Sequence, residues 1–155
     1  METSSNTNKI PTKLIENIKS YNTPERRKIL SLLQTGAELT QIRNYSSAII
    51  CYDEALVIDP DDSNVLVNKG DALTNLSRYE EAMKCYDKAL AQKPNSSMAL
   101  YNKSCIIAMQ GEADESLSLL EKAISLDSNL IEAAKTEGAF LNFRDFQRFK
   151  MILGY

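Results

Sequence analysis

The sequence of 155 residues predicts an all-α protein, built as a solenoid of stacked helical hairpins. Three observations predict this fold class. Similar residues recur every 34 positions along the chain, a period typical of repeat architectures. Within each period, small and apolar residues follow the three- and four-residue spacing of a helix face. No segment shows the sustained alternation of apolar and polar residues that is typical of a strand.

The repeat becomes visible when the sequence is shifted against itself by one period. Matching positions hold Gly36, Gly70 and Ser104; Tyr52, Tyr86 and Leu120; and Ala55, Ala89 and Ala123. A hairpin that carries one apolar stripe on each helix cannot bury both stripes alone, so neighbouring hairpins must stack. The sequence therefore predicts repeats at 29–62, 63–96 and 97–130, with a partial fourth repeat from 131.

Each repeat is expected to contain two closely packed helices. In the second repeat, Gly70 and Ala82 have almost no side chain, which lets two helix axes approach closely. Tyr79 and Tyr86 are expected to fill the remaining space, with their hydroxyl groups reaching water. Pro94 cannot continue a helix, so the second helix should end before it.

The N-terminal part of the chain carries a clear helix start at Thr23 and Pro24, a capping residue followed by proline. The predicted segments are a disordered tail at 1–8 and a helical cap with the start of the first repeat helix at 9–28. We expect residues 12–21 to fold back as a cap on Ile50 and Val57, an apolar pair that the other repeats lack. Self-association through that pair is the alternative.

The C-terminal segment 131–155 is expected to form the partial fourth repeat and a capping helix. Residues 131–143 match the first helix of a repeat. Asp145 could then cap a short helix that begins at Phe146. We expect Phe146, Phe149 and Leu153, with Ile152, to cover the last apolar surface.

Composition excludes much of enzyme chemistry. The chain has no histidine, which excludes Ser-His-Asp and Cys-His arrangements and any zinc site with a histidine ligand. Its three cysteines, Cys51, Cys85 and Cys105, are far apart and are expected to be small core residues. The sequence thus predicts a non-enzymatic protein with no catalytic residue, no metal and no cofactor.

Charge and hydropathy bear on partners and location. The net charge of −3 gives no reason to expect binding to nucleic acid or to a membrane, and the short basic run 26–28 is expected to be a solvated helix face. The first residues lack the apolar stretch of a signal peptide, and no apolar run approaches the length of a membrane span. A cytoplasmic location is the resulting expectation.

The pattern formed by Leu66, Gly70, Ala82, Tyr86 and Pro94 resembles the tetratricopeptide repeat. The resemblance implies a right-handed superhelical solenoid whose first helices line a concave groove. It further implies a scaffold or adaptor that binds a peptide or helix of a partner protein. The alternative is a self-assembling structural protein, a homodimer or larger homo-oligomer that forms through the groove or the N-terminal apolar patch.

The resemblance also implies which residues line the groove. These candidates are Gln34, Asn64, Val67, Asn68, Asp71, Met98, Tyr101, Asn102, Cys105, Met109 and Lys135. Family members that hold the C-terminal carboxylate of chaperones use lysine, asparagine and arginine at five positions. This chain has Leu33, Ala37, Asn68, Met98 and Asn102 there, and only Asn68 matches. A carboxylate clamp is therefore not expected.

A different mode of peptide binding is expected instead. Asn68 and Asn102 could bond to a peptide backbone, while Tyr101, Met98 and Met109 could form an adaptable apolar pocket. The alternative is that Tyr101 and Met109 only contact a neighbouring helix.

Overall fold

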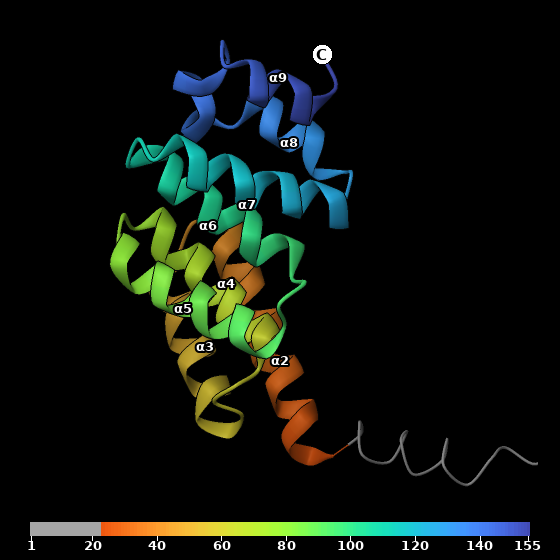
Figure 1. Ribbon diagram of the computed structural model, residues 1–155. Helices are drawn as coiled ribbons and strands as arrows, with labels where there is room; N and C mark the ends of the chain where they lie inside the picture. Colours follow the sequence, from red (N-terminus) through yellow and green to blue (C-terminus); the bar gives the residue numbers. More distant parts are fainter. Residues whose placement is uncertain (1–22) are drawn as a thin grey trace, which may run out of the picture.

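The computed structural model describes residues 23–155, which form a single stack of helices (Figure 1). The elements are α2 (Pro24–Gln41), α3 (Tyr45–Ile58), α4 (Ser63–Asn75), α5 (Tyr79–Gln92), α6 (Ser97–Met109), α7 (Ala113–Leu126), α8 (Leu130–Thr136), the 3-10 helix η1 (Gly138–Phe143) and α9 (Gln147–Leu153). The stack runs from α2 and α3 at one end to α8 and α9 at the other. The described residues contain no strand, and the predicted all-α solenoid is confirmed.

The helices pair as three hairpins. Helix α2 packs on α3, α4 on α5, and α6 on α7, while neighbouring hairpins meet through α3 with α4 and through α5 with α6. This order is what a hairpin repeat requires, because each hairpin buries its remaining apolar stripe against the next one.

The first helix begins where the sequence predicts. The hydroxyl of Thr23 accepts a hydrogen bond of 3.1 Å from the backbone N–H of Arg26, and Pro24 occupies the first turn. Predictions for residues 1–22, including the cap at 12–21, lie outside the described residues. On α3, Ile50 is 60% exposed and Val57 82% exposed within the described part of the chain.

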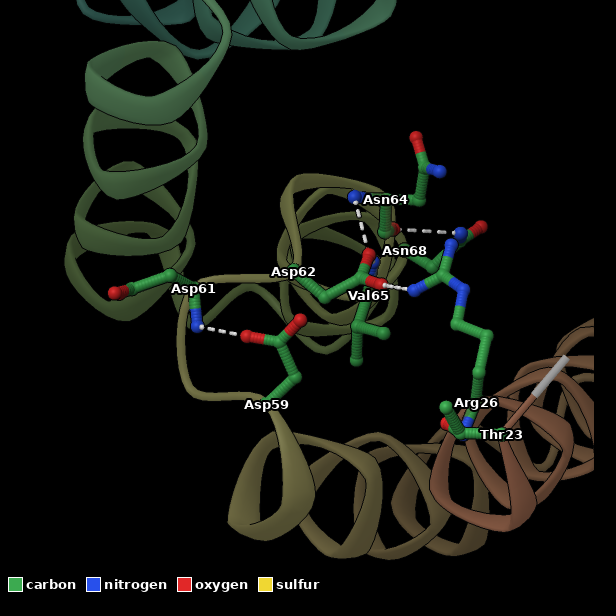
Figure 2. Close-up of polar contacts among 8 residues, drawn as sticks. All are labelled: Thr23, Arg26, Asp59, Asp61, Asp62, Asn64, Val65 and Asn68. Atoms are coloured by element: carbon green, nitrogen blue, oxygen red, sulfur yellow. Dashed lines mark hydrogen bonds and ion pairs between the residues drawn. The ribbon is translucent and has the colours of Figure 1, made fainter. Parts of the chain in front are cut away.

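Helix α4 begins at a buried carboxylate. One oxygen of Asp62 accepts hydrogen bonds from the backbone N–H groups of Asn64 and Val65, at 2.9 and 3.1 Å. Its other oxygen pairs with Arg26, whose side chain reaches across from α2 (Figure 2). The expectation of a fully solvated basic run is therefore wrong for Arg26, because it balances the charge of a residue that is only 7% exposed.

The recurring glycine makes room for a tyrosine ring. The ring of Tyr86 on α5 lies against Gly70 on α4, and Tyr86 is fully buried. The hydroxyl groups of Tyr86 and Thr74 lie 3.1 Å apart, and Thr74 donates to the carbonyl of Gly70 at 2.9 Å. The expectation that the Tyr86 hydroxyl reaches water is wrong, because it is hydrogen-bonded within the hairpin to Thr74, one turn after the glycine. Gly36, Tyr52 and Thr40 repeat the arrangement in the first hairpin.

In the third hairpin, other residues occupy the glycine and tyrosine positions. Ser104 replaces the glycine, and Leu120 replaces the tyrosine. Both Ser104 and Ser116 are fully buried, and the Ser116 hydroxyl donates to the Ser104 carbonyl at 2.9 Å. The smaller leucine leaves room for the serine β-carbon, and the two hydroxyl groups are both satisfied inside the helix pair.

The chain departs from prediction after α8. The expected helix over 131–143 is wrong, because α8 ends at Thr136 and Glu137 is extended, with ψ of 126°. Its side chain accepts the backbone N–H of Ala139 at 3.2 Å and so starts η1. Gly138 follows directly, and glycine favours leaving a helix. Within η1, Phe140 is fully buried.

The last helix closes the buried cluster of the third hairpin. Phe149 and Leu153 are 3% and 4% exposed and join the same cluster as Leu120. Asp145 does not cap the helix, because α9 starts after Phe146 without a side-chain cap. Phe146 was expected to help cover this surface but is 44% exposed, stacked on another phenylalanine at 5.3 Å.

Candidate peptide-binding groove

Two hollows adjoin on the face formed by α4 and α6. The first hollow, of about 420 Å³, is lined by Asn64, Val67, Asn68, Asp71, Lys93, Asn95, Ser96, Ser97, Met98 and Asn102. The second hollow, of about 380 Å³, is lined by Asp71, Thr74, Asn75, Tyr79, Tyr86, Tyr101, Asn102, Cys105, Met109, Glu137 and Ala139. Asp71 and Asn102 line both hollows, so the two form one continuous groove.

Helix geometry explains why these side chains gather. On α4, residues 64, 67, 68, 71 and 75 follow the spacing of one helix face, as do residues 98, 101, 102, 105 and 109 on α6. Gly70 and Ser104 lie on other faces, where α5 and α7 pack. The packed faces therefore hold α4 and α6 with their remaining faces turned to the groove.

The structure brings together nine of the eleven predicted groove residues in these two hollows. Gln34 lies outside them on α2, where its amide donates to Glu38 at 3.1 Å. Lys135 also lies outside, pairing with Glu132 at 2.7 Å, and it borders a separate hollow that includes Tyr155.

Other lining residues were missed in the sequence. Lys93, Asn95 and Ser96 come from the turn before α6 and Ser97 from its first position, whereas the family pattern covers the inward faces of the helices only. Glu137 was missed because the sequence predicts a continuous helix there.

The asparagines of the groove are partly engaged within α4. The amide of Asn68 donates to the Asn64 carbonyl at 2.8 Å, and Asn75 donates to the Asp71 carbonyl at 2.9 Å (Figure 2 shows the first bond). Each of these bonds uses one amide N–H, and an asparagine side chain has a second N–H and an oxygen for a partner.

The apolar groups of the groove differ in how much they expose. Met98 is 47% and Met109 48% exposed, so both offer their flexible thioethers to a partner. Tyr101 is only 7% exposed, and its ring meets Phe140 edge-on with centroids 6.2 Å apart. Tyr101 thus belongs to the core as well as to the wall of the second hollow.

The cysteines behave as packing residues. Cys85 and Cys105 are buried and Cys51 is half-buried, as expected. Burial, followed by the charge of Glu137, raises the pKa of Cys105 to about 12, so its thiol is neutral at pH 7. A neutral thiol is a poor nucleophile and a poor metal ligand.

Family models match two segments of the chain, residues 63–96 and 85–118, and both are described as tetratricopeptide repeat. The first match covers α4 and α5 with the turns that follow them. The chain contains tetratricopeptide repeats. No curated protein matches its sequence significantly.

Solved structures share the fold of this chain. A mutant O-GlcNAc transferase of Thermobaculum terrenum is 21% identical, with a TM-score of 0.70 over 77% of this chain and 23% of that one. MamA is 22% identical, with a TM-score of 0.67 over 92% of this chain and 82% of that one. The second such domain of human RPAP3, solved with an HSP70 peptide, is 18% identical, with a TM-score of 0.62 over 83% of this chain and 97% of that one.

This chain spans about a quarter of the length of the O-GlcNAc transferase that it matches. In residues 23–155, no helix combines the length and the apolar character needed to cross a membrane. The same residues hold no group of three or more cysteine and carboxylate side chains that could bind a metal ion.

Proposed function

We propose that this protein is a non-enzymatic interaction module that holds a peptide or helix of a partner protein in the groove on α4 and α6. The observation that carries the proposal is the pair of adjoining hollows, which share Asp71 and Asn102. Each hollow has room for partner side chains, and the amides between them can bond a peptide backbone. The RPAP3 domain of similar fold, bound to an HSP70 peptide, supports a peptide as the partner.

The groove favours apolar and amide contacts over a carboxylate clamp. Leu33, Ala37 and Met98 replace the charged or amide side chains that hold a terminal carboxylate in other members of the family. Charge-assisted hydrogen bonds supply much of the strength of such a clamp. We therefore propose that the partner's recognised segment is internal, without a required C-terminal carboxylate.

Self-assembly is the second candidate function. The exposure of Ile50 and Val57 on α3 favours it, because both are large apolar side chains on one helix. This patch lies on α3, while the groove is formed by α4 and α6, so the two candidates predict different sensitive residues.

Selection of peptides by the intact protein tests the groove. A phage library of random twelve-residue peptides is selected on the wild-type chain, and the affinity of each recovered peptide is measured by fluorescence polarisation. We expect Met98→Glu and Met109→Glu each to weaken binding by about tenfold or more, because the bound peptide would bury the new carboxylate against its apolar groups. Both side chains are about half exposed, so both variants should fold.

Met151→Glu is the matched control, since this methionine is 69% exposed on α9 and lies outside both hollows. It should bind the peptides as wild type does. Peptides that bind all three variants equally well would place the binding surface elsewhere. A wild-type chain that selects no peptide would contradict the proposed function.

A further inference from the structure

The second hollow is acidic, which distinguishes it from the first. Asp71 and Glu137 stand on its walls, and none of its lining residues is lysine or arginine. The first hollow contains Lys93 as well as Asp71, so charges of both signs are present there. A partner side chain that enters the second hollow therefore meets carboxylates without a neighbouring positive charge.

Asp71 is an anion that lacks a partner within residues 23–155. The carboxylate is half-buried on α4, and neither an ion pair nor a hydrogen bond to it occurs in this part of the chain. Burial raises the pKa of Asp71, with no opposing charge to lower it. Other carboxylates near the interfaces are paired, such as Asp62 with Arg26 and Asp87 with Lys103. An incoming cation would offset the cost of burying the Asp71 charge.

Glu137 supplies the second carboxylate from a fixed position. One of its oxygens accepts the backbone N–H of Ala139, which holds the side chain at the start of η1. Its charge contributes to the raised pKa of both Tyr101 and Cys105, after the larger effect of burial on each. The negative charge of Glu137 therefore acts on two other side chains that line this hollow.

Aromatic rings complete the lining. Tyr79, Tyr86 and Tyr101 all border the second hollow, and of the three only Tyr79 is more than slightly exposed. A guanidinium group is planar, stacks on aromatic rings and donates two parallel hydrogen bonds to a carboxylate. The ammonium group of lysine has the same charge but neither the flat shape nor the paired donors.

We infer that the second hollow binds an arginine side chain of the partner, placed between Asp71 and Glu137. The inference rests on the proposed function and specifies the partner as a peptide that carries arginine at the position seated in this hollow. The adjoining first hollow then holds residues on one side of that arginine.

The test uses peptides selected from the random twelve-residue phage library on the wild-type chain. We expect arginine to recur at one position of these peptides. Replacing that arginine by citrulline, a neutral side chain of nearly the same shape, should weaken binding by about tenfold or more. Lysine at the same position should retain part of the affinity.

Protein variants complete the test. Asp71→Asn should lower the affinity for the arginine peptide about tenfold and leave the affinity for the citrulline peptide nearly unchanged. Glu137→Gln keeps an oxygen that can accept the Ala139 N–H, so it removes the charge while it retains the cap. Glu137→Gln should likewise lower the affinity for the arginine peptide and leave that for the citrulline peptide nearly unchanged. Glu115→Gln, an equal change of charge at an exposed site on α7, is the matched control and should have no effect.

The outcomes separate this inference from the proposed function. Selected peptides that bind without a preference for arginine over citrulline would overturn the inference and leave the groove proposal standing. Equal losses for both peptides in Asp71→Asn would indicate a structural role for Asp71 and would also overturn it. If no peptide is selected at all, the proposed function fails, and this inference fails with it.

Discussion

The ring of Tyr86 lies so close to the backbone of Gly70 that a β-carbon at Gly70 would stand 2.8 Å from Cζ of the ring. Gly36 and Tyr52 have the same relationship in the first hairpin, with a corresponding distance of 2.7 Å. In the first two hairpins, the glycine is thus required by its tyrosine. The contact explains why the two residue types recur together along the sequence.

Gly70→Ala should destabilise the protein although alanine is the better helix former. The added methyl group meets a fully buried ring closer than van der Waals contact allows, and overpacking of this kind costs about 1–3 kcal/mol. Urea unfolding of the variant gives the free energy of unfolding. Gly138→Ala is the control, because a β-carbon there meets nothing within 4 Å, and its effect should stay within about 0.5 kcal/mol. Equal effects of the two changes would mean that the ring contact is not what requires the glycine.

Leu120→Tyr should destabilise the third hairpin for the same reason. The larger ring would meet the β-carbon of Ser104, which occupies the position of Gly70 in the second hairpin. Adding Ser104→Gly should recover part of the loss, giving a favourable coupling of about 1 kcal/mol or more between the two positions. A double-mutant cycle from urea unfolding measures this coupling. Strictly additive effects would show that the two positions do not pack together.

The pair of Arg26 and Asp62 should couple more strongly than an exposed ion pair. Asp62 is only 5% exposed in its side chain, and it caps α4 as well as pairing with Arg26. We expect a coupling of about 1–3 kcal/mol in a cycle built from Arg26→Met and Asp62→Asn. The control cycle uses Lys69 and Asp53, where the carboxylate is 53% exposed, and should give less than about 1 kcal/mol. Equal coupling energies in the two cycles would contradict the structural role given to Arg26.

Alkaline pH should destabilise the protein through Cys105. Burial, followed by the charge of Glu137, raises the pKa of this thiol from 9.0 to about 12, so the unfolded chain loses the proton first. The stabilisation is complete below pH 9 and is lost as pH rises from 9 toward 12, at up to about 1.4 kcal/mol per pH unit. Urea unfolding between pH 9 and 10 should therefore show a shallower decline for Cys105→Ala than for wild type. Parallel slopes would mean that the thiol titrates alike in both states.

Sedimentation velocity over a range of concentrations tests the self-assembly alternative. If the protein is an interaction module, wild type should remain a monomer, and Ile50→Lys should sediment in the same way. Ile50 is exposed, so this change should not affect folding. A dimer of wild type that Ile50→Lys dissociates would instead support self-assembly through α3.

The sequence by itself determined the repeat, the hairpins and the face of each helix that meets the groove. These features follow from local rules. The helical period decides which residues share a face, and Thr23 and Pro24 start the first helix through contacts within one turn. For that reason, nine predicted groove residues lie together in the two hollows.

Only the tertiary structure decided the features that join distant parts of the chain. The pairing of Arg26 with Asp62 spans 36 positions, and no local pattern indicates which acid a surface arginine will meet. The break at Glu137 replaces the expected helix, because the turn to η1 brings Phe140 against Tyr101 and Phe149 in the core. The same break brings Glu137 to the lining of the hollow that Asp71 also borders, and so makes that hollow acidic. Periodicity describes single helices, whereas the charge of a groove depends on how the hairpins stack.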